Sequence, residues 1–163
     1  MSVPGAFTPT CQNDHVPGYI RLLPELKAKG VDQVVVIGYN DAFVMAAWGK
    51  ANGVKDDSIV CAPSPFPSPP HLPPLPLPLI LIYIYRERDQ KGERTNRHLS
   101  TSTHNQIFAS DDEAAFSSTL GWTMGARTAR YAVAVDHGKV VYAEKEPTRA
   151  LDVSSAEAVL AKL

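Results

Sequence analysis

Apolar residues along the first fifty positions alternate between helical spacing and a continuous run. A first helical turn is predicted from Cys11 to about His15. A second apolar set recurs at helical spacing until Gly30, and it consists of Tyr19, Ile20, Leu22, Leu23 and Leu26. The β-branched run at 33–38 (QVVVIG) is typical of a strand buried on both faces. A helix capped by Asp41 should follow, with these apolar residues on one side: Phe43, Val44, Ala47 and Trp48.

The last third of the chain predicts a β-hairpin and a short helix. Two stretches, at 129–135 and 139–144, flank the turn sequence DHG, which suits a hairpin. Either Ser154 or Ser155 can cap a final helix over 156–162. Because strands and helices alternate along the chain, the sequence predicts an α/β fold.

Composition is consistent with one modest domain over residues 1–163. Of these 163 residues, 44% are hydrophobic, which suffices for a single core. The net charge of −1 gives no reason to expect nucleic acid or an anionic membrane surface as a partner. Cys11 and Cys61 do not form a disulfide framework, and we expect no signal peptide. The chain therefore suits a reducing compartment such as the cytoplasm.

The segment 4–11, PGAFTPTC, places a cysteine where a helix should begin. A cysteine reacts as its thiolate, and at its ordinary pKa of about 8.5 only a few per cent is ionised at neutral pH. Backbone N–H groups at a helix N-terminus and a nearby cation make such a sulfur a nucleophile. The Thr8 hydroxyl can donate and accept a hydrogen bond beside the sulfur. Pro4 would cover the site and limit the access of water to it. Cys11 is therefore a candidate nucleophile, and the alternative is a buried structural cysteine in a proline-rich loop.

The pattern P-x-x-x-T-x-x-C resembles the active-site signature of the peroxiredoxins. The longer string at 3–18, VPGAFTPTCQNDHVPG, is similar to their type-5 branch, common in fungi and plants. The stretch NDAFV at 40–44, followed by WG, resembles a further helix of that family. The resemblance implies a thioredoxin-like fold and a thiol peroxidase that reduces hydrogen peroxide and alkyl hydroperoxides. It also implies that Cys11 is the peroxidatic residue, Thr8 its hydrogen-bonding partner and Pro4 its shield.

The residues RYAV at 130–133 resemble the stretch that holds the active-site arginine of the family, so we choose Arg130 for that role. A guanidinium stays charged and offers several donors in a rigid fork. Arg127 is the rival, and its expected place in a turn favours a solvated role. His15 leaves two interpretations open, either a base acting on the Cys11 thiol or a packing or capping residue near the loop.

The resemblance also implies a mechanism and partners. Cys61 matches no resolving position of two-cysteine peroxiredoxins, which favours a one-cysteine mechanism with an external thiol reductant. That reductant would be glutathione with glutaredoxin, or thioredoxin. A homodimer is expected by analogy, and the family implies no cofactor. No metal site is expected either, because ligand spacing is lacking among Cys61, His71, His98 and His104.

Residues 60–106 depart from the family. This segment holds nine of the fourteen prolines and a polar tract, and no periodicity survives in it, so we expect disorder there. Its apolar stretch at 75–85 is too short to span a bilayer. Without the segment, Ile59 would join Ile107 in a passage that resembles the family's uninterrupted strand. We interpret 60–106 as a translated intron, and the rival interpretation is a genuine proline-rich insertion that recruits a partner with an SH3-like groove.

The two ends of the chain complete these expectations. Family members carry a central strand before the VPGAFTP loop, and only Met1 and Ser2 precede that loop here, so we expect a fold that is incomplete at the N-terminus. This favours an alternative in which the chain is an inactive fragment or a proline-rich interaction protein. The final residues Ala161-Lys162-Leu163 resemble the S-K-L peroxisomal address, which makes peroxisomal localisation the alternative to the cytoplasm.

Overall fold

The computed structural model describes residues 1–54 and 106–163. Its elements are β1 (Ser2–Val3), η1 (Cys11–His15), α1 (Val16–Arg21), α2 (Leu23–Ala28), β2 (Val34–Gly38), α3 (Ala42–Ala51), β3 (Gln106–Ser110), η2 (Asp112–Ala114), α5 (Ala115–Thr119), β4 (Thr123–Met124), β5 (Arg127–Thr128), β6 (Tyr131–Asp136), β7 (Lys139–Lys145) and α6 (Ala156–Leu160). Apart from Gln106, the segment predicted at 60–106 lies outside the described residues, as do Cys61, His71, His98 and His104.

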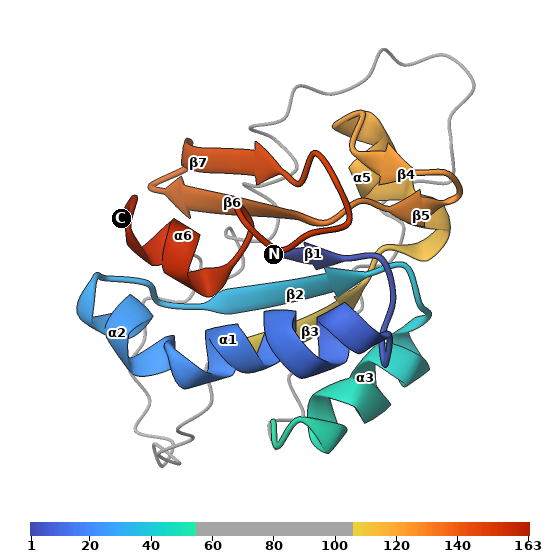
Figure 1. The fold of residues 1–163 in the computed structure, drawn as a ribbon, viewed down its shortest axis with the longest axis horizontal. Helices are drawn as coiled ribbons and strands as arrows, with labels where there is room; N and C mark the ends of the chain where they lie inside the picture. The colour runs from blue at the N-terminus through green and yellow to red at the C-terminus, as the bar shows by residue number, and fades with distance from the viewer. Residues whose placement is uncertain (55–105) are drawn as a thin grey trace, which may run out of the picture.

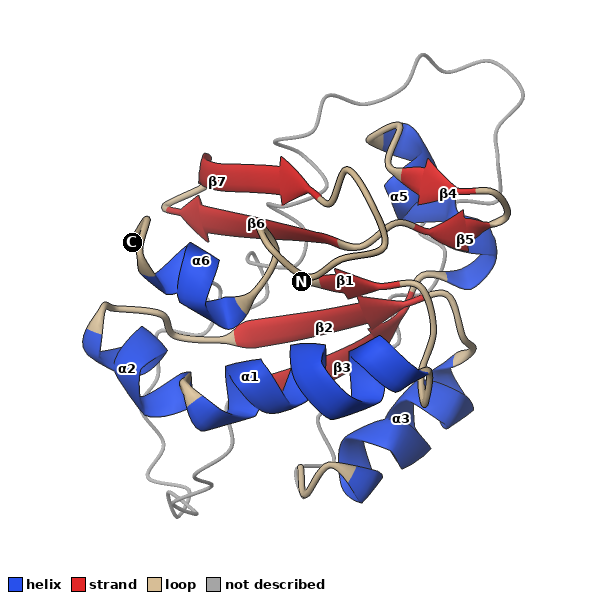
Figure 2. Ribbon diagram, viewed as in Figure 1, coloured by secondary structure: helices blue, strands red, loops and turns tan. Residues whose placement is uncertain are grey.

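The main sheet has five strands in the order β3-β2-β1-β6-β7 (Figure 1). Strands β1, β2 and β3 run parallel, and β6 and β7 are antiparallel to their neighbours. Parallel neighbours require crossover connections, and η1, α1 and α2 make the one between β1 and β2. These helices and α3 lie along the β2–β3 side of the molecule (Figure 2). The α/β prediction is confirmed.

The centre of the sheet is occupied by a strand of only two residues. Ser2 pairs with Ile37 on one side and Tyr131 on the other, and Val3 pairs with Gly38. The terminal ammonium of Met1 adds a hydrogen bond of 2.7 Å to the Val35 carbonyl. These few residues connect β2 to β6 in the sheet.

Helix α3 differs from the prediction in the face that it buries. The Phe43 side chain is 88% exposed and Ala47 is also exposed, whereas Met45, Trp48 and Gly49 are buried. Asp41 caps the helix, accepting from the backbone N–H groups of residues 43 and 44, so the cap is as predicted. Positions 45, 48 and 49 follow the i, i+3, i+4 spacing of one helix face, which leaves position 43 on the opposite face.

The contact between α3 and β3 is close because one residue of the helix lacks a side chain. The Trp48 ring packs edge-on against Phe108 at a centroid distance of 5.4 Å. A Cβ atom added at Gly49 would come within 3.1 Å of the Phe108 ring. The glycine therefore allows the helix to approach the sheet without displacing a buried aromatic ring.

The C-terminal predictions are confirmed with shifted bounds. Strands β6 and β7 form the hairpin, and His137 and Gly138 between them have φ of 45° and 79°, as a tight hairpin turn requires. Helix α6 ends at Leu160, two residues before the predicted end. Ser155 is its cap and accepts from the backbone N–H of Ala158 at 3.1 Å.

Candidate active site around Cys11

The loop between β1 and η1 has a tightly fixed backbone. Asn40, which follows β2, accepts a hydrogen bond of 2.7 Å from the Ala6 N–H. A Cβ atom at Gly5 would lie 3.3 Å from Cγ2 of Thr8, so the loop has little space for a larger residue. Phe7 has a left-handed backbone with φ of 57°, an unusual conformation for a residue other than glycine. Strain of this kind persists only where the surrounding contacts hold the backbone, as Asn40 does here.

Cys11 lies in the first turn of the helix that follows this loop. Thr10 already has helical dihedral angles (φ −63°, ψ −37°), and the Gln12 N–H donates to the Thr8 carbonyl at 2.8 Å. N–H groups in a first turn have no acceptor within the helix and present partial positive charge. The Cys11 side chain is fully buried. The sulfur is thus placed near helical N–H groups and away from bulk water.

Arg130 reaches the sulfur from the other half of the sheet. It precedes β6, is 8% exposed, and its Nη2 donates to the Cys11 Sγ at 3.4 Å. Its Nη1 lies 2.9 Å from Nδ1 of His15. Arg127 is instead exposed in β5. Of the two arginines considered in the sequence, Arg130 is the one that contacts the candidate nucleophile.

Thr8 and Pro4 lie in the loop as the sequence places them. The Thr8 hydroxyl donates to the Gly5 carbonyl at 2.9 Å, so its oxygen is left with acceptor capacity only. Pro4 is buried. The loop therefore presents an acceptor oxygen three residues before Cys11, and Pro4 lies in the interior of the protein.

His15 is a buried packing residue beside Tyr19, which agrees with the second interpretation of the sequence and not with the first. Its Nε2 contacts the Ser154 carbonyl at 2.8 Å, where it must donate, so its Nδ1 accepts from Arg130. Burial, aided by the Arg130 charge, lowers the pKa of His15 to about 3. A neutral ring with both nitrogens engaged does not remove a proton from the thiol. Instead, it orients the guanidinium.

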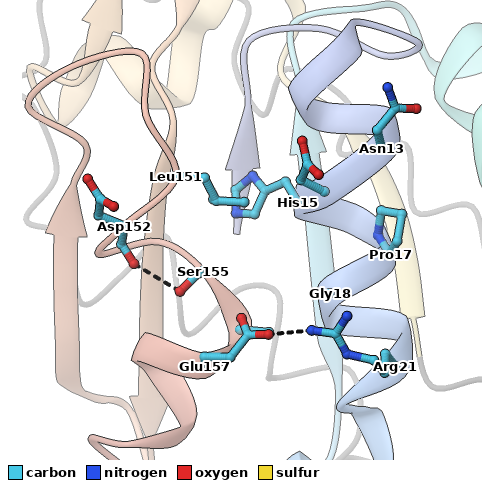
Figure 3. Close-up of a pocket in the computed structure, with 11 residues that line it drawn as sticks. Asn13, His15, Pro17, Gly18, Arg21, Leu151, Asp152, Ser155 and Glu157 are labelled. Carbon is cyan, nitrogen blue, oxygen red and sulfur yellow. Dashed lines mark hydrogen bonds and ion pairs between the residues drawn. The ribbon is translucent and has the colours of Figure 1, made fainter.

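A polar groove passes beside His15, between α1 and α6 (Figure 3). Asn13, His15 and Gly18 lie on the α1 side, and Leu151, Asp152 and Ser155 lie opposite. An ion pair between Arg21 and Glu157 crosses the groove, and both side chains are more than half exposed. Solvent-exposed pairs of this kind contribute at most about 1 kcal/mol.

Sequence reasoning missed three residues that surround His15. Tyr19 donates to the Ser154 carbonyl at 3.0 Å, alongside His15. Ser154, considered only as a helix cap, is held in turn by the buried carboxylate of Glu146. The contacts of His15 and Tyr19 with Ser154 join residues 139 and 135 positions apart, so no local pattern reveals them. Glu146 lies only eight positions from Ser154, but no motif marks it as a partner of that residue.

Comparison with known proteins assigns this arrangement to a family. The chain matches the Redoxin family over residues 1–66 and 80–160. It is 40% identical to peroxiredoxin Pen c 3 of Penicillium citrinum over all of this chain and 71% of that protein. Reduced Prx3 of Vibrio vulnificus, solved in complex with hydrogen peroxide, is 31% identical with a TM-score of 0.64, covering 99% of this chain and 78% of that one. The chain belongs to the peroxiredoxins.

Membership establishes the general activity and fold. The protein is a thiol peroxidase of the fungal type-5-like group, with the thioredoxin-like fold predicted from the sequence. Its substrate is a peroxide and its reductant a thiol. A relative in Lipomyces kononenkoae, 33% identical over all of this chain and 73% of its own length, is named as peroxisomal. Among the described residues, no helix is long and apolar enough to cross a membrane.

Proposed function

We propose that Cys11 is the peroxidatic nucleophile of this thiol peroxidase, with Arg130, Thr8 and Pro4 completing its site. The Cys11 thiolate attacks one oxygen of hydrogen peroxide or an alkyl hydroperoxide, and an S–O bond forms as the O–O bond breaks. The sulfur is oxidised to sulfenic acid, and the second oxygen leaves as hydroxide or alkoxide and takes up a proton.

The hydrogen bond of 3.4 Å between Arg130 and the Cys11 sulfur is the observation that supports this role best. A buried guanidinium favours the thiolate over the neutral thiol electrostatically. The same group carries further N–H donors in a rigid fork, which suit the negative charge that develops on the leaving oxygen. Both effects accelerate the same step.

Thr8 and Pro4 are assigned to binding the peroxide and keeping water out. Since the Thr8 hydroxyl donates to Gly5, its oxygen is available to accept the proton of an incoming peroxide. Thr8 can therefore orient the peroxide, while Arg130 stabilises the charge that develops on it. The buried ring of Pro4 limits competing water near the sulfur.

A one-cysteine cycle is the mechanism that we assign to this chain. Among the described residues Cys11 is the free cysteine, so an external thiol would reduce its sulfenic acid. Glutathione with glutaredoxin and thioredoxin are the two candidates, and steady-state turnover with each purified system would show which one supports catalysis. A homodimer is proposed by analogy and is tested by sedimentation in the reduced and oxidised states.

Trapping the sulfenic acid tests the assignment directly. The purified chain is treated with one equivalent of hydrogen peroxide in the presence of dimedone, and its intact mass is followed over time. We expect rapid addition of one adduct, none in Cys11→Ser, and at least a tenfold slower addition in Arg130→Lys, because an ammonium cannot reproduce the fork. Labelling of the native protein no faster than that of a free thiol would refute the assignment of Cys11.

We further propose that Ala161-Lys162-Leu163 directs the protein to peroxisomes. The tripeptide is similar to S-K-L, and the Lipomyces kononenkoae relative is named as peroxisomal. A fluorescent protein fused to the last ten residues should accumulate in peroxisomes, whereas the same fusion ending after Ala161 should not. Diffuse cytoplasmic signal from the complete fusion would favour the cytoplasm.

A further inference from the structure

Glu146 is a buried carboxylate that the reaction described above does not use. It follows β7, is 6% exposed, and its backbone N–H donates to the Arg130 carbonyl at 2.9 Å. The residue therefore lies beside Arg130 in the backbone. Its side chain points to a different partner.

One oxygen of that carboxylate accepts three hydrogen bonds from the segment before α6. Oε1 of Glu146 accepts from the Asp152 N–H at 2.8 Å and from the Ser154 N–H and hydroxyl, both at 2.7 Å. The other oxygen, Oε2, is buried and has no partner among the described residues. The carboxylate thus fixes the position of Ser154, because three donors converge on a single oxygen.

The carbonyl of Ser154 continues the connection to the active site. It accepts from Nε2 of His15 at 2.8 Å and from the Tyr19 hydroxyl at 3.0 Å. This contact determines which ring nitrogen of His15 carries the proton and how the ring is turned. The Nδ1 lone pair is thereby directed at Nη1 of Arg130, 2.9 Å away.

Arg130 depends on the neutral His15 ring for its position, since the described part of the chain offers it no partner of opposite charge. Among the described residues, no carboxylate forms an ion pair with its guanidinium. Its two side-chain partners are His15 and the Cys11 sulfur. A shift of Ser154 would therefore pass through the histidine ring to the guanidinium that faces the sulfur.

We infer that Glu146 is a positioning residue for peroxide reduction, which acts through Ser154 and His15 to hold Arg130 against Cys11. This inference rests on the proposed roles of Cys11 and Arg130. The residue touches neither the sulfur nor the guanidinium side chain, so its effect is on geometry. A displacement near 1 Å at a reacting centre is enough to cost about a hundredfold in rate.

The test compares Glu146→Ala with Glu146→Gln and with Glu144→Ala, a matched removal of an exposed carboxylate on β7. The rate constant of Cys11 oxidation by hydrogen peroxide is measured by stopped flow from pH 5 to 9, and stability by urea unfolding. Glu146→Ala should lower the rate about 10- to 100-fold and change the pH–rate profile, because Arg130 would no longer be held against the sulfur. Glu146→Gln keeps an oxygen that accepts the same donors and should remain within about threefold of the native rate. Glu144→Ala should leave the rate and profile unchanged.

Two outcomes would overturn the inference. One is a Glu146→Ala variant that is less stable but oxidises with the native rate and pH profile. The other is a Glu146→Gln variant as slow as Glu146→Ala, since the charge and not the hydrogen bonding would then matter. If Glu146→Ala does not fold, the oxidation rate of Glu146→Asp is measured instead, because its shorter side chain withdraws the carboxylate by about 1.5 Å. A native oxidation rate in Glu146→Asp would refute the positioning role. Failure of the proposed function itself shows separately, as slow oxidation of Cys11 in the native protein.

Discussion

At the scale of single residues, the site combines a buried cation with a histidine that is kept neutral. Arg130 and His15 are 8% and 1% exposed, and their side chains lie 2.9 Å apart. A protonated imidazole there would add a second positive charge beside the guanidinium, at a high cost in a buried location. The pKa of about 3 for His15 follows from this burial, and it makes the ring a reliable acceptor for Arg130 throughout the physiological pH range.

This depressed pKa predicts how stability changes with pH. Below pH 6.5 the histidine of the unfolded chain takes up a proton that the folded chain does not bind until about pH 3. The contribution of His15 to stability should therefore be complete above about pH 6.5 and decline as the pH falls towards 3, by about 1.5–2 kcal/mol between pH 6.5 and 5. Urea unfolding at a series of pH values measures this slope.

The control for this measurement is a pair of histidine variants. His15→Gln should be less stable than the native protein at pH 7 but should lose less stability on acidification. His137→Gln removes an exposed histidine paired with Asp136 and should leave the pH dependence nearly unchanged. Parallel stability curves for the native protein and His15→Gln would contradict the role assigned to burial.

At the scale of elements, local patterns in the sequence were sufficient for most of the fold. The β-branched run that became β2 and the turn that joins β6 to β7 were predictable, because their signals lie within a few residues of one another. The face of α3 was not, because the exposed Phe43 reverses the usual preference of a large apolar side chain, and the helix buries Gly49 instead. Burial of that glycine depends on the Phe108 ring, which lies on β3 far along the chain.

The residues of the candidate site also divide into those that the sequence could select and those whose contacts depend on the fold. Cys11, Thr8 and Pro4 lie within eight consecutive positions, and a family resemblance at the sequence level was enough to select them together with Arg130. The link from Arg130 through His15 to Ser154 joins residues separated by 115 and 139 positions. Only the sheet order, which places β6 beside the two-residue β1, brings these partners together.

At the scale of the whole molecule, we propose that the chain folds as one domain. The strand order predicts that residues 60–106 can be deleted from this domain without loss of the fold. Strand β3 pairs in parallel with β2 over five residues, from Val34 with Gln106 to Gly38 with Ser110. Deleting 60–106 would remove one residue of this ladder, Gln106, and place Ile59 opposite Val34 in its stead. An apolar β-branched residue suits that position at least as well as glutamine. The ladder and the contact between Trp48 and Phe108 would both be retained.

We therefore predict that a chain joining Ile59 directly to Ile107 folds and keeps the chemistry of Cys11. Its urea unfolding midpoint should equal or exceed that of the full chain, because a shorter connection costs less entropy to close. Its rate of sulfenic acid formation should lie within about threefold, since Arg130 and His15 reach the sulfur from elements that the deletion does not touch. A matched control deletes the same number of residues starting at Val54. This deletion also removes residues that join α3 to the next part of the chain. Loss of folding in the Ile59–Ile107 chain would show that the segment belongs to the domain. Independently of folding, transcripts that always contain the segment would refute the intron interpretation.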